Sequence, residues 1–153
     1  MRQRTLAAAL LLLAFSAVGL AAALEVYNSF YLHRSAPLAC TYPVRVSGVA
    51  VNCLDVLSSG YSRVYSFSLD ELAIAWFSAD LALSALTIAT GLPRALRVAQ
   101  AAWRFLGVSF VPYLVYLELF RIHAICVYCT TMHVMLIANA VVAAAELKGS
   151  GPL

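Results

Sequence analysis

Residues 125–147 read ICVYCTTMHVMLIANAVVAAAEL, and this stretch decides the fold. It is apolar along nearly its whole length, and Glu146 is its only Asp, Glu, Lys or Arg. A helix needs about 20 mostly apolar residues to cross a bilayer. We therefore predict a transmembrane helix over residues 125–147, with Cys126 and Cys129 in its first turn.

Three further stretches have the length and the apolar character of membrane spans, at about residues 5–30, 69–91 and 99–120. The composition agrees, because 63% of the residues are hydrophobic and only 11% are charged. A soluble domain carries about 25% charged residues. The sequence therefore predicts an all-α membrane protein, a single domain over residues 1–153 built as a bundle of four transmembrane helices.

The first predicted span also has features of a secretory signal peptide. Arg2 and Arg4 precede the apolar run, and small residues follow it at positions 21–23. The apolar core of a signal peptide is about 7–15 residues long, and the run here is longer. We therefore expect the first helix to be retained.

A long connection, residues 33–65, separates the first two predicted spans. Its first half contains Pro37, Pro43 and Gly48 and is expected to be irregular. Residues 52–59 are expected to form a short helix at the membrane interface. The predicted bundle thus carries one substantial outer loop, and this loop holds Cys40 and Cys53.

The charge pattern bears on orientation. Ten Lys and Arg residues against seven Asp and Glu residues give a net charge of +3, which is too small and too scattered to indicate nucleic-acid binding. Basic residues favour the cytoplasmic side of a membrane, and Arg2, Arg4, Arg94, Arg97 and Lys148 would all lie there. We expect a multi-pass protein of the cell membrane, with both termini in the cytoplasm and all four cysteines on the extracytoplasmic side.

The spacing of Cys126 and Cys129 suits a reversible redox pair. Two intervening residues let the sulfur atoms meet across one helical turn. The positive end of the helix dipole favours thiolate over thiol, and thiolate is the form that attacks disulfides. A structural disulfide or two buried thiols would also fit this motif.

A second pair, Cys40 and Cys53, would lie on the same side of the membrane. Two pairs on one side permit a relay, in which a soluble dithiol reduces the outer pair, the outer pair reduces Cys126 and Cys129, and these reduce an acceptor in the membrane. Two alternatives remain: a membrane scaffold with structural disulfides, and a four-thiolate metal site. Structural zinc usually uses two closely spaced pairs, and the chain has one.

Two segments resemble the vitamin K epoxide reductase family: CLDVLSSGYSR at residues 53–63, and YLELFRIHAICVYCTTMH at residues 116–133. The resemblance covers nearly the whole chain and implies four helices around a quinone pocket. It implies that Cys126 and Cys129 are the catalytic pair, with Cys129 beside the quinone. Cys126 would exchange with Cys53, and Cys40 would meet the partner protein.

The resemblance also implies residues that bind the quinone. Ser59 would close the pocket and support the reactive cysteine, His133 would hydrogen-bond a quinone oxygen, and Tyr61 and Phe77 would line the pocket. From the residues themselves, Ser59 could equally be a helix-end cap and His133 a core histidine. At Leu69 the sequence departs from the family, since an asparagine binds the quinone there in animal enzymes. That difference favours a plain quinone over an epoxide as substrate.

The implied activity is that of a quinone-dependent thiol–disulfide oxidoreductase that supports disulfide formation. Its partners would be a separate thioredoxin-like protein, the lipid bilayer and a quinone, which would be menaquinone, phylloquinone or ubiquinone. No metal is expected.

Two further expectations concern charged residues inside the predicted spans. An intramembrane carboxylate is costly, so Asp80 either has a function or faces an arginine or the bundle interior. Glu118 and Arg121 are three residues apart in a predicted helix and are expected to form an ion pair.

Overall fold

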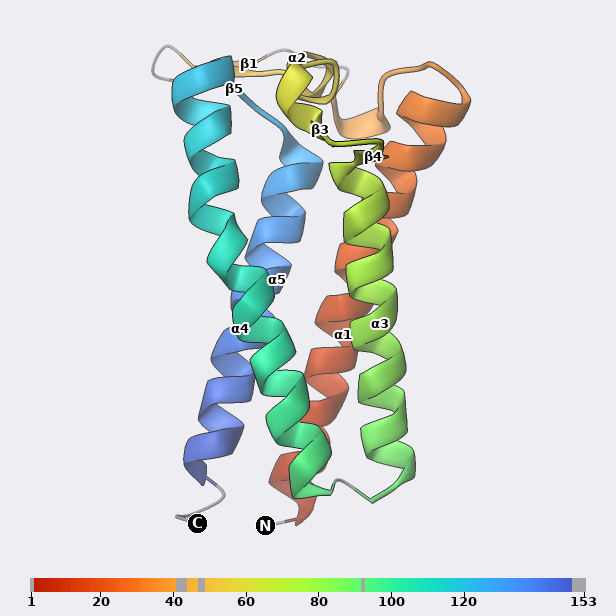
Figure 1. Cartoon of the computed structure of the whole chain (residues 1–153), viewed down its shortest axis with the longest axis vertical. Helices are drawn as coiled ribbons and strands as arrows, with labels where there is room; N and C mark the ends of the chain where they lie inside the picture. Colours follow the sequence, from red (N-terminus) through yellow and green to blue (C-terminus); the bar gives the residue numbers. More distant parts are fainter. Residues whose placement is uncertain (1, 41–43, 47–48, 92, 150–153) are drawn as a thin grey trace.

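The computed structural model describes residues 2–40, 44–46, 49–91 and 93–149, and these are mostly helical (Figure 1). Four long helices run alongside one another: α1 (Arg2–Val26), α3 (Leu69–Ala89), α4 (Arg94–Tyr116) and α5 (Val127–Gly149). Within these described ranges, four helical segments are long and apolar enough to cross a membrane. The predicted all-α bundle of four transmembrane helices is confirmed.

Two of the helices end in π-helical turns. α1 continues into η1 (Tyr27–Leu32), and α4 continues into η4 (Leu117–Ile122). Both π segments lie at the same end of the bundle as the cysteine loop, whereas the first turn of α1 and the last turn of α5 lie at the opposite end (Figure 1). We call the end with the loop the cap end.

α1 is the central packing partner, because it lies against both α3 and α5 along the bundle. α3 begins with a capping box: the Glu71 N–H donates to Ser68 Oγ at 3.1 Å, and the Ser68 N–H donates to the Glu71 carboxylate at 2.7 Å. These two bonds satisfy backbone N–H groups that a helix start leaves open. They fix the point where the cap passes into the bundle.

The third membrane helix starts earlier than predicted. We expected it from about residue 99, and α4 begins at Arg94. Pro93 is its N-cap residue. Because proline lacks a backbone N–H, it costs little at a helix start, and the helix begins directly after it.

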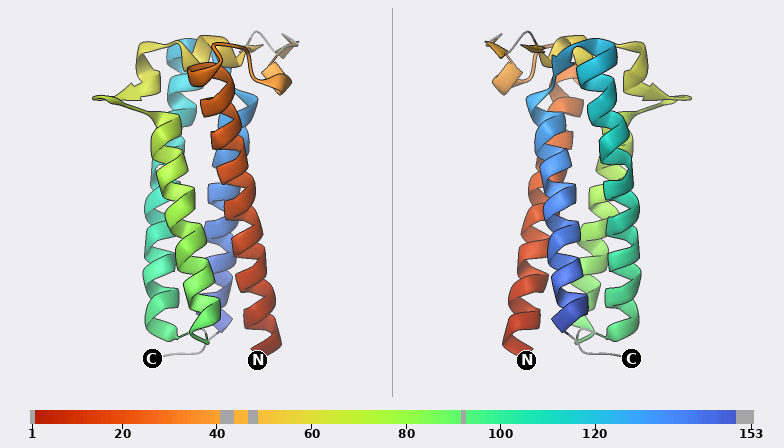
Figure 2. Two further views of the ribbon diagram at one scale, coloured as in Figure 1. Left: turned by 90° about the vertical axis from the view of Figure 1, so that its right-hand side faces the viewer. Right: turned by 90° about the vertical axis from the view of Figure 1, so that its left-hand side faces the viewer.

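The cap contains short elements only: η2 (Leu38–Cys40), β1 (Val44–Val46), β2 (Val49–Val51), α2 (Cys53–Leu57), η3 (Gly60–Ser62), β3 (Arg63–Val64) and β4 (Phe67–Ser68). The short helix expected within residues 52–59 is α2. β1 pairs antiparallel with β2, and β2 pairs in parallel with β5 (Ala124–Ile125), which directly precedes Cys126. The β3–β4 hairpin projects sideways from the bundle (Figure 2).

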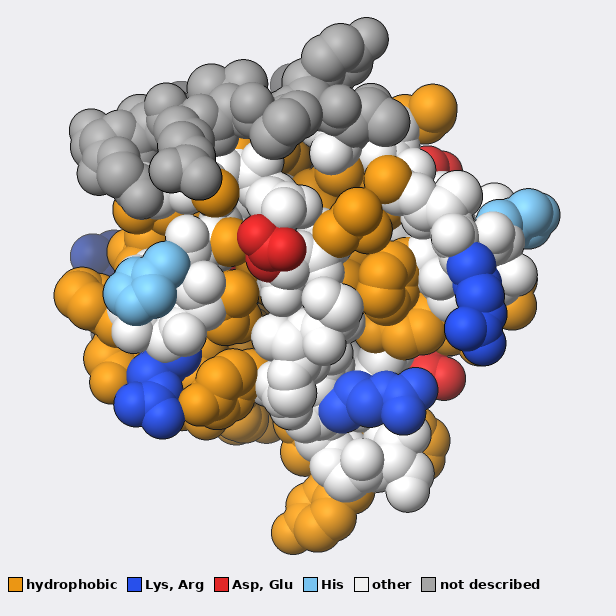
Figure 3. Space-filling view, turned by 90° about the horizontal axis from the view of Figure 1, so that it is seen from above, with side chains coloured by type: hydrophobic (Ala, Val, Ile, Leu, Met, Phe, Trp, Pro, Cys, Tyr) orange, Lys and Arg blue, Asp and Glu red, His pale blue; other side chains and the backbone are white. Residues whose placement is uncertain are grey.

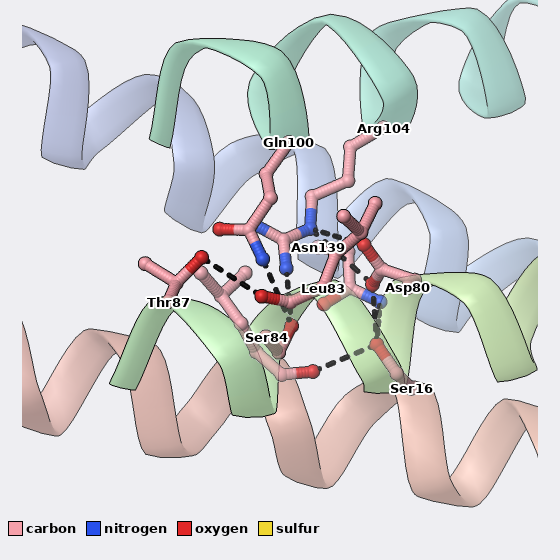
Figure 4. Close-up of polar contacts among 9 residues, drawn as sticks. Ser16, Asp80, Leu83, Ser84, Thr87, Gln100, Arg104 and Asn139 are labelled. Atoms are coloured by element: carbon pink, nitrogen blue, oxygen red, sulfur yellow. Dashed lines mark hydrogen bonds and ion pairs between the residues drawn. The ribbon is translucent and has the colours of Figure 1, made fainter. Parts of the chain in front are cut away.

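A buried polar cluster joins all four helices at the level of Asp80 (Figure 4). Arg104 on α4 pairs with Asp80 on α3 at 3.1 Å and donates to Ser84 at 2.8 Å. Ser16 on α1 donates to Asp80 at 2.5 Å, and Asn139 on α5 donates to Ser16 at 3.2 Å. Asp80 therefore faces an arginine in the bundle interior, which was one of the two expectations for it.

Candidate active site

The four cysteines lie together at the cap end. Cys40 and Cys53 form a disulfide, and Cys126 and Cys129 are free thiols. Cys40, Cys53 and Cys126 belong to one buried hydrophobic cluster, and Cys129 packs against it. Cys53 and Cys126 are fully buried, whereas Cys40 keeps 8% of its surface exposed. The two pairs are thus neighbours in one apolar environment.

Backbone pairing brings Cys53 next to Cys126. The parallel register sets Val51 opposite Ile125, and the Asn52 N–H donates to the Ile125 carbonyl at 3.1 Å. β5 leads directly into Cys126, and β2 leads through Asn52 into Cys53. This pairing could not be predicted from the sequence, because a two-residue strand such as β5 has no pattern of its own.

Tyr128, inside the C-x-x-C motif, holds the segment that carries the other outer cysteine. Its hydroxyl oxygen accepts a hydrogen bond from the Ala39 N–H at 3.3 Å. Ala39 directly precedes Cys40, so one side chain of the inner motif fixes the position of the outer pair. From the sequence alone, Tyr128 is predicted only to be an aromatic residue at the membrane interface.

The inner pair begins α5. Cys126 directly precedes the helix, and the Cys129 N–H donates to Cys126 Sγ at 3.3 Å. The sulfur thus takes the place of the oxygen that usually accepts this bond at a helix N-cap. The positive end of the helix dipole and this N–H both favour negative charge on Cys126.

A cavity of about 610 Å³ lies between α3, α4, α5 and the cap. Cys129 lines it, together with the four predicted pocket residues Ser59, Tyr61, Phe77 and His133. The other three cysteines are not among its lining residues. Of the two pairs, Cys129 is therefore the sulfur that meets the cavity.

The predicted pocket residues differ in their contacts. His133 is one turn beyond Cys129 on α5 and is only 8% exposed. Ser59 Oγ donates to the Val56 carbonyl at 2.7 Å, so Ser59 both ends a helix and lines the cavity. The Tyr61 hydroxyl accepts a bond from Arg121 at 3.0 Å.

Aromatic side chains that the sequence analysis did not single out form one wall of the cavity. Trp76 on α3 stacks on Trp103 on α4, with ring centroids 3.9 Å apart and planes 9° apart. Gly107 makes room for this stack, since a Cβ there would lie 2.7 Å from the Trp76 ring. Phe77 packs closely over Gly19 of α1 in the same way. In the sequence, the glycines within the predicted membrane helices were the feature that could have indicated these close contacts.

Two buried carboxyl groups, Asp70 and Glu118, also line the cavity. The Glu118 carboxyl lies next to the Cys129 thiol and the backbone of Cys126. The ion pair expected between Glu118 and Arg121 was wrong: Arg121 is exposed and contacts Tyr61 instead. The reason is η4, because a π-helical turn rotates less per residue and directs residues three apart to different faces.

The donor set suits an apolar ring with polar oxygens better than a metal. Pockets that bind small organic molecules usually measure about 300–1,000 Å³ and have apolar walls with a few polar groups. Within the described ranges, no group of three or more His, Cys, Asp or Glu side chains converges as metal ligands would. Two of the four cysteines are moreover bonded to each other. A quinone ring therefore fits the residues present.

The described part of the face at the cap end is mixed in character. In the view from this end, basic, acidic and hydrophobic side chains lie interspersed (Figure 3). Leu38, two residues before Cys40, is 79% exposed on this side of the molecule.

Comparison with known protein families gives one result that agrees with this geometry. The model of the vitamin K epoxide reductase family matches residues 9–144 of the chain. The match spans the four helices and all four cysteines. No curated protein matches the chain.

Proposed function

The chain belongs to the vitamin K epoxide reductase family, and we propose that it is a quinone-linked thiol–disulfide oxidoreductase of the cell membrane. It takes electrons from the dithiol of a separate thioredoxin-like protein and passes them to a quinone in the bilayer. The partner leaves with a disulfide, so the protein supplies oxidising equivalents for disulfide formation outside the cytoplasm. The family membership and the four membrane spans support the membrane redox role.

One observation carries the proposal: four cysteines form a continuous buried cluster, and a single one of them, Cys129, opens onto the cavity. Cys40 does not line that cavity and keeps 8% of its surface exposed, whereas its disulfide partner Cys53 keeps none. The partner's thiolate attacks Cys40 and releases Cys53 as a thiolate. Cys53 attacks Cys126 of an oxidised Cys126–Cys129 pair and releases Cys129, and the β2–β5 pairing holds the two segments together. The partner's second thiolate then frees Cys40 and leaves with a disulfide. Cys40 displaces Cys126 from Cys53, which restores the Cys40–Cys53 disulfide and leaves Cys126 and Cys129 reduced.

The last step transfers the electron pair out of the protein. The Cys126 and Cys129 thiols together lose two electrons and two protons and form a disulfide. A bound quinone takes up both electrons and two protons and becomes hydroquinone. All four predicted pocket residues line the cavity, which supports their proposed roles. In the proposal His133 donates a hydrogen bond to one quinone oxygen, Ser59 closes the pocket and supports the reactive cysteine, and Tyr61 and Phe77 contact the quinone. The quinone is of the menaquinone, phylloquinone or ubiquinone type.

The test is hydroquinone formation by the purified protein with a small dithiol as donor. We expect the wild type to reduce added menaquinone, ubiquinone or both, and Cys129→Ala to lose this activity. Removing the sulfur that faces the cavity leaves no path from the outer pair to the acceptor. Equal rates in the wild type and in Cys129→Ala would refute the mechanism.

The same preparation separates this activity from the two alternatives. A scaffold with structural disulfides would keep both pairs oxidised in the presence of a mild reductant. A four-thiolate metal protein would retain stoichiometric zinc after purification. The redox relay requires instead that Cys40–Cys53 is reduced by the dithiol and reoxidised on addition of quinone, which thiol alkylation and mass spectrometry can follow.

A further inference from the structure

Glu118 is placed in the interior by an irregular segment of helix. It lies in the π-helical turns of η4, and only 6% of its surface is exposed. π-Helical turns inside longer helices occur frequently at functional sites. Here the turn directs a carboxyl group from the side of a membrane helix toward Cys129 and the cavity.

The surroundings of Glu118 give it no structural partner of opposite charge. Among the described residues the ion pair is Arg104–Asp80, which lies deeper in the bundle, and Arg121 contacts Tyr61. A buried carboxylate without a cation is costly. The groups that do face it are the Cys129 thiol and the backbone of Cys126. The arrangement therefore places an acceptor for protons beside a thiol that must lose one.

We propose that Glu118 is a catalytic base that removes the proton of the Cys129 thiol, an inference that rests on the proposed function. As the Cys129 S–H bond breaks, the proton goes to the Glu118 carboxylate and the sulfur keeps the electron pair. The sulfur then delivers that pair to the quinone while Cys126 bonds to Cys129 and loses its own proton to water. The reduced acceptor takes one proton from Glu118 and one from water, and the carboxylate is restored.

Several other groups near the site titrate and bear on the pH dependence. From α3, Asp70 lies in the same cavity, and from α5, His133 lies one turn below Cys129. From the cap, the Tyr61 hydroxyl is held by Arg121 on the segment that carries Glu118. Of these, Glu118 is the carboxyl group that contacts both cysteines of the inner pair. The Asp70 charge also acts on the Cys129 thiol, so the test changes Glu118 while Asp70 is kept.

The test measures the reactivity of the inner pair without quinone or partner. In a Cys40→Ala/Cys53→Ala background, the reduced protein is alkylated with N-ethylmaleimide between pH 5 and pH 10, and mass spectrometry follows Cys129. We expect Glu118→Gln to slow alkylation at neutral pH by on the order of 10²-fold, a usual contribution of general acid–base catalysis. The rate should recover toward pH 10, where the thiol ionises without a base. Glu118→Asp keeps the carboxyl group and should restore part of the rate.

Glu25→Gln is the matched control. Glu25 is a half-buried carboxyl group on α1 that accepts a bond from Ser29 and does not line the cavity. Its variant should behave as the parent protein at every pH. Equal rates for parent and Glu118→Gln would overturn the proposal, and so would faster alkylation in Glu118→Gln, since a carboxylate that acts only through its charge disfavours a nearby thiolate. So would a loss by the same factor at every pH, which indicates a structural role, or a Cys129 that is unreactive in the parent protein.

This experiment fails or succeeds independently of the proposed function. If Cys129 reactivity depends on Glu118 but the wild type forms no hydroquinone, the quinone-linked function is wrong, and the role of Glu118 as the base for the Cys129 thiol stands. If hydroquinone forms at the same rate in wild type and in Glu118→Gln across the pH range, the function stands and the base is wrong.

Discussion

At the scale of single residues, Gly107 sets the shape of the cavity wall. A Cβ at this position would lie 2.7 Å from the Trp76 ring, which is stacked on Trp103. We expect Gly107→Ala to displace Trp76 into the cavity and to cost about 1–3 kcal/mol of stability, the usual range for overpacking. Thermal unfolding in detergent should show the loss, and the KM for quinone should rise.

Gly60→Ala is the matched control, because a Cβ there meets no atom within 4 Å. It lies in the cap beside Tyr61, so it also controls for general sensitivity of this region. An unchanged KM for quinone in Gly107→Ala would show that the Trp76 wall does not contact the substrate.

The residues around Cys129 divide into those that sequence could predict and those that it could not. Ser59, Tyr61, Phe77 and His133 were predicted by resemblance, and all four line the cavity with Cys129, although their roles stay predictions. Glu118 was assigned to an ion pair because the spacing rule assumes an α-helix. Its contact with the thiol depends on a π-helical turn, and no local pattern of apolar residues announces such a turn.

At the scale of elements, the Asp80–Arg104 pair holds four helices through one polar cluster. We expect Arg104→Leu to destabilise the bundle by about 3–5 kcal/mol, because it leaves a buried carboxylate unpaired. The double variant Asp80→Leu/Arg104→Leu should recover much of that loss, since it removes both charges. Thermal unfolding of the three purified proteins gives the comparison.

The same variants decide whether Asp80 has a function besides packing. If the pair is structural, the double variant should reduce quinone at the wild-type rate per folded molecule. A folded double variant without activity would assign the cluster to the reaction. A double variant less stable than Arg104→Leu would contradict the pairing argument itself.

The long elements were predictable and the short ones were not. Four apolar runs of sufficient length predict four spans, because the bilayer imposes that length on any crossing helix. The β2–β5 pairing joins residues 50–51 to residues 124–125, which are far apart in the sequence, so no local pattern indicates it. The start of α3 is a different case, since Ser68-x-x-Glu71 is a recognisable capping box that the sequence analysis did not use.

At the scale of the whole molecule, the bundle and the cap divide the chemistry between them. α3, α4, α5 and the cap enclose an apolar cavity, and the cap also holds the disulfide. Successive membrane spans alternate in direction, so the connections after the first and third predicted spans lie at the same end of the bundle. The sequence therefore predicted that all four cysteines lie at that end. It left three disulfide connectivities open, and the structure selects Cys40–Cys53.

The cap leaves Cys40 slightly more exposed than Cys53, and under the proposed function this gives a prediction for living cells. Cys40 keeps 8% of its surface exposed and Cys53 none. A thioredoxin-like partner should therefore bond to Cys40, and Cys53 should be needed to release it. We expect Cys53→Ala to accumulate a mixed disulfide with the partner, seen on non-reducing gels after acid quenching and lost on reduction. Cys40→Ala is the control and should form none, and an adduct of equal abundance in both variants would contradict the order of the relay.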